Sequence, residues 1–252
     1  MSDTNHIIYT LISYALTFVL LILFDKKICE EKGKNIVLKI FALATVGIHY
    51  SSLYVDFFKN GEAIMEDTML LPIYPCNVAM WLLLICAFYK NKDSKIFKHI
   101  AVATFYLGLI GGSIGLIFNE NYISDPNLLN WDVLKGLLSH STLVFGSIYL
   151  LAGGYVSIRV KNIISVIGCL LGLLLDGVLI IGIHLLFKLD PPNCMYLLEN
   201  PFPEIPWFNS VIIGVLAVLL VFIITALYEQ ITLEKEERWY TKLHNKLVKR
   251  EC

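Results

Sequence analysis

Two residues of this chain carry side chains that could act together as a nucleophile and a base. Cys76 lies at the start of an apolar run, Leu71-Pro72-Ile73-Tyr74-Pro75-Cys76-Asn77, and His140 lies inside another, Leu137-Leu138-Ser139-His140-Ser141. An imidazole beside a thiol stabilises or generates the thiolate, which can attack an ester carbonyl and form a thioester. Pro75 favours a helix start here, and the positive end of a helix dipole also favours the thiolate. The pair predicts acyl chemistry if both side chains face the same side.

Long apolar segments must position these residues. The chain has 252 residues, of which 57% are hydrophobic and 16% charged, whereas about a quarter of the residues in soluble domains are charged. About 20 apolar residues are needed to cross a bilayer core, and lipid leaves the backbone no partner except within a helix. We therefore predict an all-α polytopic membrane protein, a single integral membrane domain over residues 1–252. Its seven transmembrane helices are expected near residues 7–24, 36–58, 71–89, 99–118, 132–156, 162–187 and 208–230, before a charged tail at 231–252.

Lysine and arginine are unevenly distributed between the loops. They are frequent in the stretches 25–35, 90–98 and 159–161 and in the tail, whereas the alternate loops hold only Lys59 and Lys188. Under the positive-inside rule, the N-terminus is outside and the C-terminus is cytoplasmic. The net charge of −1 therefore conceals a polarised molecule, and it gives no indication of nucleic-acid binding.

This orientation predicts the depth of each reactive residue. At about 1.5 Å per residue, Cys76 lies roughly 7 Å, His140 roughly 12 Å and His49 roughly 13 Å below the outer ends of their spans. His184 lies about one turn from the outer end of the 162–187 span, and Asp176 lies near its middle. Ionisable residues inside a membrane are costly and mark functional sites. The outer half of the membrane is therefore the predicted location of the site.

Each of these residues also has a structural explanation. Cys76 could be a small buried hydrophobe, and His140 with Ser139 could hydrogen-bond across helices. Asp176 could be protonated or held by a structural hydrogen bond. A disulfide between Cys76 and Cys194 would remove the nucleophile. The histidines and Cys76 could be metal ligands, but no paired spacing such as HxxxH or CxxC is present, so we predict no metal and no soluble cofactor.

Two further groups of residues have open or structural roles. An oxyanion formed during acyl transfer needs hydrogen-bond donors, which any of four asparagines could supply: Asn77, Asn119, Asn121 or Asn193. Glycines at small-xxx-small spacing predict close helix packing in the 99–118 and 162–187 spans. They are Gly108, Gly111, Gly112 and Gly115 in the first, and Gly168 and Gly172 in the second.

Four motifs occur in the order seen in the YwaF-like membrane proteins, a bacterial family related to the animal acyltransferase called transmembrane protein 164. They are Leu-Pro-Ile-Tyr-Pro-Cys-Asn at 71–77, Phe-Tyr-Leu-Gly-Leu-Ile-Gly-Gly at 105–112, Leu-Leu-Ser-His-Ser at 137–141 and Asn-Cys-Met-Tyr-Leu at 193–197. The resemblance covers residues 45–200 and implies a seven-span transacylase-like protein of the bacterial plasma membrane. An acyl chain would move between phospholipid and lysophospholipid through a cysteine thioester.

The resemblance also implies roles for single residues. Cys76 would be the nucleophile and His140 its base, while Asn193, Met195 and Tyr196 would shape the site. The chain departs from the family pattern at two positions. Cys194 stands where tyrosine is usual, and Tyr74 stands where bacterial members often have histidine, which puts a third catalytic group in doubt.

The sequence thus favours a cysteine-dependent lipid acyltransferase, transacylase or acyl hydrolase working at the outer leaflet. The alternatives are a transporter or receptor that binds a small amphiphile in an outward-facing cavity, and a scaffold in which the polar residues only join helices. Besides the catalytic pair, we expect eight residues to bind substrate or support the site: His49, Asn77, Asn119, Ser139, Asp176, His184, Asn193 and Tyr196.

Overall fold

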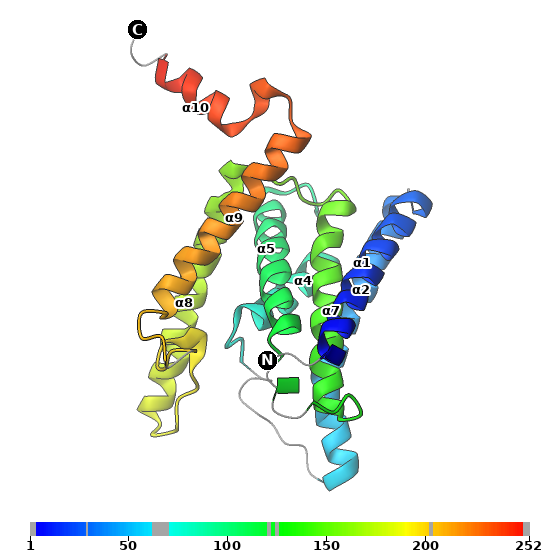
Figure 1. Ribbon diagram of the computed structural model, residues 1–252, viewed down its shortest axis with the longest axis vertical. Helices are drawn as coiled ribbons and strands as arrows, with labels where there is room; N and C mark the ends of the chain where they lie inside the picture. Colours follow the sequence, from blue (N-terminus) through cyan, green and yellow to red (C-terminus); the bar gives the residue numbers. More distant parts are fainter. Residues whose placement is uncertain are drawn as a thin grey trace. The chain divides into compact units, whose positions relative to one another are not determined.

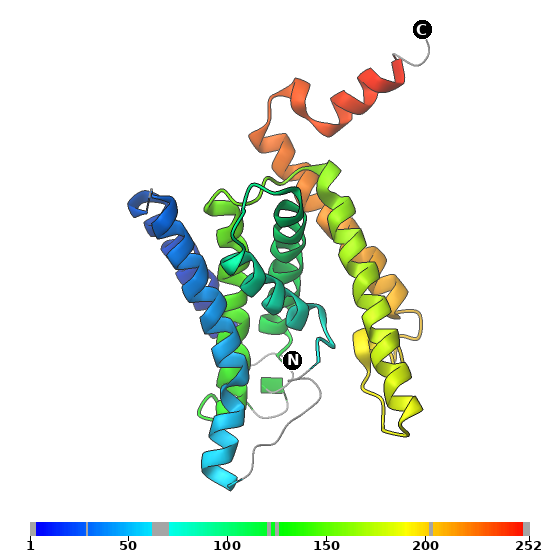
Figure 2. The same cartoon turned by 180° about the vertical axis from the view of Figure 1, so that it is seen from behind.

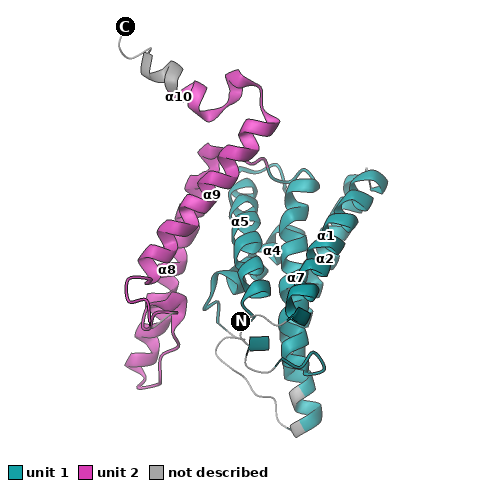
Figure 3. Ribbon diagram, in the orientation of Figure 1, with its two compact units in different colours: residues 1–156 teal, residues 157–252 magenta. Residues whose placement is uncertain are grey.

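The computed structural model describes residues 4–28, 30–61, 71–119, 122–123, 126–201 and 204–248, without the side chains of Asp56, Asn60 and residues 244–248. All regular secondary structure within these ranges is helical (Figure 1). The chain divides into two compact units, Met1–Val156 and Ser157–Cys252 (Figure 3). Each unit is described by itself below.

The described residues of the first unit form a bundle of five helices: α1 (Thr4–Lys27), α2 (Glu31–Asn60), α4 (Pro75–Phe88), α5 (Lys95–Ile117) and α7 (Trp131–Ala152). Helix α7 packs against both α2 and α5, and α4 packs against α5 and α2 (Figures 1 and 2). Helix α1 packs against α7 and α5. The helices that carry His49, Cys76 and His140 therefore belong to one packed bundle.

In the second unit, the described residues form two long helices, α8 (Ile163–Leu186) and α9 (Ser210–Thr232), and the shorter α10 (Trp239–Val248). Three 3-10 turns accompany them, η1 (Val160–Asn162), η2 (Cys194–Tyr196) and η3 (Lys235–Glu237). The buried carboxylate of Glu229, near the end of α9, accepts hydrogen bonds from Val160 N at 2.7 Å and Trp239 N at 2.9 Å. One side chain thus satisfies the backbone at the starts of η1 and α10.

Within the part of the chain that the structure describes, six helical segments are long and apolar enough to cross a bilayer: Thr4–Lys27, Glu31–Lys59, Lys95–Ile117, Trp131–Ala152, Val160–Leu186 and Ser210–Thr232. Large apolar side chains stay exposed along them, such as Leu11 at 64% and Phe18 at 66% on α1. Exposed apolar side chains along whole helices are expected where the helices face lipid. The chain is therefore a helical membrane protein, as predicted, and six of the seven expected spans match these helices.

The predicted span at 71–89 differs from the structure. Residues 71–74 are not helical, and α4 begins only at Pro75, after an extended Tyr74 with φ −120° and ψ 157°. Proline disfavours helix in the residue before it but fits the first helical position, which explains this start. The 14 residues of α4 rise about 21 Å, which is shorter than the roughly 30 Å of a bilayer core.

Polar side chains fix where other helices begin. Ser94 accepts a hydrogen bond from Phe97 N at the start of α5, and Asn130 accepts one from Asp132 N at the start of α7. Such caps satisfy backbone N–H groups that a helix leaves without partners. The cap at Asn130 also sets the position of His140 along α7, since the intervening residues rise regularly.

Candidate active site

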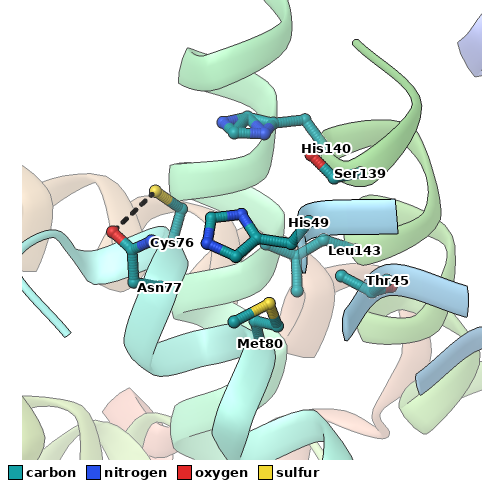
Figure 4. Close-up of a pocket in the computed structure, with 8 residues that line it drawn as sticks. All are labelled: Thr45, His49, Cys76, Asn77, Met80, Ser139, His140 and Leu143. Atoms are coloured by element: carbon teal, nitrogen blue, oxygen red, sulfur yellow. Dashed lines mark hydrogen bonds between the residues drawn. The ribbon is translucent and has the colours of Figure 1, made fainter. Parts of the chain in front are cut away.

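A small cavity in the first unit brings together side chains from α2, α4 and α7 (Figure 4). Its volume is about 30 Å³, enough for about two water molecules. Five of the residues expected at the site line it, and three further residues complete the lining. The lining residues are Thr45, His49, Cys76, Asn77, Met80, Ser139, His140 and Leu143.

Cys76 lies in the first turn of α4, directly after Pro75. The side chain of Asn77 accepts hydrogen bonds from Tyr74 N at 3.3 Å and from the Cys76 thiol at 3.9 Å. The first contact closes the start of the helix, and the second orients the thiol. Cys76 is half-buried, and within the described part of the chain neither it nor Cys194 forms a disulfide, so the thiol is retained.

Glycines of α5 let α7 approach closely, as their spacing predicts. A Cβ atom at Gly108 would collide with the Ser147 side chain, and one at Gly112 would lie 2.8 Å from Cγ2 of Val144. A Cβ atom at Gly115 would collide with the His140 ring, whose Cγ would be only 2.8 Å away. The imidazole of His140 thus occupies the space that a larger residue would take on α5.

The same face of α5 also contacts Cys76. A Cβ atom at Gly111 would lie 3.3 Å from Cys76 N and 3.6 Å from Cys76 Cβ. Gly111 and Gly115 are four residues apart, and side-chain positions with this spacing are about 5–6 Å from each other. The helix therefore holds Cys76 and His140 roughly one turn apart, and both side chains turn toward the cavity (Figure 4).

A second imidazole, His49 of α2, also lines the cavity (Figure 4). Its ring makes an edge contact with the ring of Tyr50, with 5.2 Å between the ring centroids. Tyr50 in turn packs on Trp81 of α4, with 6.0 Å between their ring centroids. Its Nε2 atom is buried and has no hydrogen-bond partner among the described residues. Buried polar atoms are nearly always satisfied, so an unsatisfied one in a cavity indicates a place for a water or a ligand.

Hydroxyl groups near His140 are already engaged. Ser139 donates to Gly136 O at 3.0 Å, within its own helix. Ser141 donates to Leu137 O at 2.7 Å and contacts Ser13 of α1 at 3.1 Å. These bonds fix α7 beside α1 without using the imidazole.

Sequence reasoning missed several neighbours of the site. Thr45 and Met80 are each four residues from an expected site residue, and Leu143 is three residues from His140. Helical spacing alone would have placed all three on the same faces. Lys135 was also overlooked although it is charged and lies inside a span; its Nζ donates to Ser52 Oγ at 3.2 Å and pairs with Asp132 at 3.4 Å.

Asn119 packs near Gly136, one turn before His140 on α7, but it does not line the cavity. Its Oδ1 accepts a hydrogen bond from Tyr122 N at 2.9 Å. Its Nδ2 atom would be only 2.8 Å from a Cβ atom placed on Gly136. It therefore caps the turn after α5 and packs on α7. Asn121 lies outside the described residues.

Asp176 and His184 belong to α8 in the second unit. The Oδ2 atom of Asp176 is buried and has no hydrogen-bond partner in the described part of the chain. His184 Nδ1 bonds Ile180 O at 2.9 Å within its own helix.

Asn193 organises the loop after α8. Its Oδ1 accepts from Leu198 N and Glu199 N at 3.0 and 3.1 Å, and its Nδ2 donates to Glu199 O at 2.9 Å. The next residues bend sharply, with φ of 50° at Met195 and 58° at Tyr196. A left-handed backbone at two adjacent non-glycine residues is strained, and it persists only where the surroundings impose it. Here the loop packs on α8, where a Cβ atom of Gly177 would lie 3.2 Å from Cys194 Cβ.

Comparison with known proteins identifies the family. No curated protein and no solved structure matches the chain. The sequence model of the TMEM164 family matches residues 1–228, a range that includes most of α9 and every residue of the cavity. The protein therefore belongs to the TMEM164 family.

Proposed function

We propose that this protein is a membrane acyltransferase that moves an acyl chain from a phospholipid to a lysophospholipid through a thioester on Cys76. The observation that carries the proposal is the shared cavity, in which a thiol at a helix start and an imidazole lie one turn apart along α5. The resemblance to YwaF-like proteins supports the same roles for Cys76 and His140.

The reaction follows from these two groups. His140 takes the proton of the Cys76 thiol, and the thiolate attacks the carbonyl carbon of the phospholipid ester. The carbon–sulfur bond forms, the ester carbon–oxygen bond breaks, and the lysophospholipid leaves with the proton returned by His140. A second lysophospholipid then gives its hydroxyl proton to His140 and attacks the thioester carbonyl. The new ester bond forms, the carbon–sulfur bond breaks, and the Cys76 thiolate takes the proton back from His140.

The size of the cavity favours a substrate that stays in the membrane. Ligand pockets for molecules of drug size occupy about 300–1,000 Å³, whereas this cavity has about 30 Å³. A cavity of this size, beside Met80 and Leu143, suits a small reacting group, and in this proposal the acyl chain stays in lipid. The small volume counts against the alternative of a transporter or receptor that encloses a small amphiphile.

The proposal includes a topology. Taking α4 as a short third membrane helix gives seven membrane helices, with the N-terminus outside and the C-terminal tail in the cytoplasm. The support is the concentration of lysine and arginine in alternate loops and in the tail. This orientation puts Cys76 at the outer-leaflet side of what we propose is a bacterial plasma membrane.

The test uses the full-length protein in nanodiscs containing phospholipid with an isotopically labelled acyl chain. We expect an acyl adduct on Cys76 by mass spectrometry, its removal by hydroxylamine, and labelled phospholipid after lysophospholipid is added. The Cys76→Ala variant should lose both adduct and transfer. Cys86→Ala is the matched control, because Cys86 is buried in the same helix beside Thr104 at 3.5 Å. Unchanged transfer by Cys76→Ala would refute the proposal, and an intact bound lipid without adduct would favour a binding protein.

A further inference from the structure

The unpartnered Nε2 atom of His49 is the feature of the cavity that the two-residue mechanism leaves unused. It is buried, it has no hydrogen-bond partner among the described residues, and its ring lines the space beside Cys76 (Figure 4). A ring nitrogen held in a small cavity without a partner among the described residues can bind an atom that arrives during the reaction. The acyl carbonyl oxygen is the atom that must enter this cavity.

The reaction requires a donor of this kind. When the thiolate attacks, the carbonyl oxygen becomes an oxyanion, and hydrogen-bond donors aimed at it contribute strongly to catalysis. Asparagine side chains are less suited to this role. Asn119 does not line the cavity and caps Tyr122 N, while Asn193 is bonded within its own loop in the second unit.

Asn77 does line the cavity, but the bonds of its side-chain oxygen serve another purpose. That oxygen accepts from Tyr74 N and from the Cys76 thiol. Asn77 thus holds the start of α4 and the nucleophile in place. These two contacts are those of a positioning residue, and they use the oxygen of the amide rather than its Nδ2 N–H groups.

The two imidazoles are held by different elements. His140 of α7 fills the space over Gly115, whereas the ring of His49 of α2 makes an edge contact with Tyr50, which packs on Trp81. The pair therefore approaches Cys76 from two helices, and this arrangement allows one to move protons while the other stabilises charge.

We propose that His49, in the tautomer with its proton on Nε2, donates a hydrogen bond to the oxyanion of the tetrahedral intermediate. As the carbon–sulfur bond forms, the carbonyl π electrons move to the oxygen that His49 binds. When the carbonyl re-forms, the ester carbon–oxygen bond breaks and His140 returns its proton to the leaving hydroxyl. His49 keeps its proton throughout. This inference rests on the proposed acyl transfer at Cys76.

Two reactions of the same thiol separate this role from that of a base. Alkylation of Cys76 by iodoacetamide needs the thiolate but forms no oxyanion, whereas acylation by phospholipid needs both. We expect His49→Leu to slow acylation about 10²–10³-fold, the range for loss of one oxyanion donor, while alkylation stays within about twofold of wild type. His49→Gln, which keeps an N–H donor, should recover part of the acylation rate. His140→Leu should slow both reactions.

The outcomes are distinct. If wild-type protein forms no Cys76 adduct, the acyl transfer itself is wrong. If wild type forms the adduct and His49→Leu acylates at the same rate, only the role of His49 is wrong. If His49→Leu slowed acylation and alkylation equally, the role of His49 as an oxyanion donor would also be wrong, because His49 would then act on the thiol. Gel filtration and thermal unfolding of each variant verify that the fold is kept, and His49→Gln provides the comparison if His49→Leu does not fold.

Discussion

A single methyl group at position 115 should disable the site without touching any reactive atom of Cys76. In Gly115→Ala, the new Cβ atom would collide with Cδ2 and Nε2 of His140 and lie 2.8 Å from its Cγ. Normal contact between carbon atoms is about 3.5–4.0 Å. The helices have little room to separate, because Gly108 and Gly112 pack against the same face of α7.

The size of the effect follows from this overlap. To restore contact distance, the ring must move by at least about 1 Å, and a misplacement of that size can cost about 10²-fold in rate, or about 2.7 kcal/mol of barrier. Overpacking costs stability as well, typically about 1–3 kcal/mol. We therefore expect Cys76 acylation to slow by about two orders of magnitude, with a moderate loss of thermal stability.

The assay is the single-turnover rate of Cys76 acylation, measured with thermal unfolding of the same samples. Gly47→Ala is the matched control, because no described atom lies within 4 Å of a Cβ atom there. It should keep the wild-type rate and gain up to about 1 kcal/mol from helix propensity. A Gly115→Ala protein that acylates Cys76 at the wild-type rate would show that the position of the His140 ring does not govern catalysis.

Two further predictions concern residues away from the cavity. Burial raises the pKa of Tyr155, outside the membrane segments, so the unfolded chain loses this proton first and stability should fall as pH rises above about 10. Tyr155→Phe should flatten that alkaline slope in thermal unfolding, and an unchanged slope would exclude Tyr155 as its source. Glu229→Ala removes the acceptor for Val160 N and Trp239 N, and it should destabilise the fold by roughly 3 kcal/mol or more, since bonds to charged groups contribute about 1.5–3 kcal/mol each. The exposed Glu237→Ala serves as control and should lose less than about 1 kcal/mol; equal losses would contradict the role of Glu229.

Hydropathy predicted six of the helices well, because a membrane helix needs only a long apolar segment. It failed at the start of α4, where Leu71 and Ile73 are apolar but the prolines at 72 and 75 prevent helix until Pro75. Small-xxx-small spacing correctly predicted close packing of α5. The same spacing at Gly168 and Gly172 of α8 does not produce it in the described residues, where a Cβ atom at either glycine would have no neighbouring atom within 4 Å.

His49, Cys76 and His140 line one cavity, whereas their depths in a membrane stay a prediction. What the sequence could not supply is the direction of each side chain. Helix rotation decides that His49 leaves Nε2 without a partner among the described residues and that Asn119 turns to Tyr122. These side-chain directions depend on packing between helices that are far apart in the sequence, and a local sequence pattern does not predict that packing.

The small volume of the cavity bears on the fate of the acyl group. A space of about 30 Å³ holds about two waters, so an acyl carbonyl that enters it must displace them. Little water would then remain near the acyl-enzyme to hydrolyse the thioester, so the lysophospholipid hydroxyl would react with little competition from water. We expect transfer to exceed release of free fatty acid, and the ratio of these two products measures how dry the loaded cavity is.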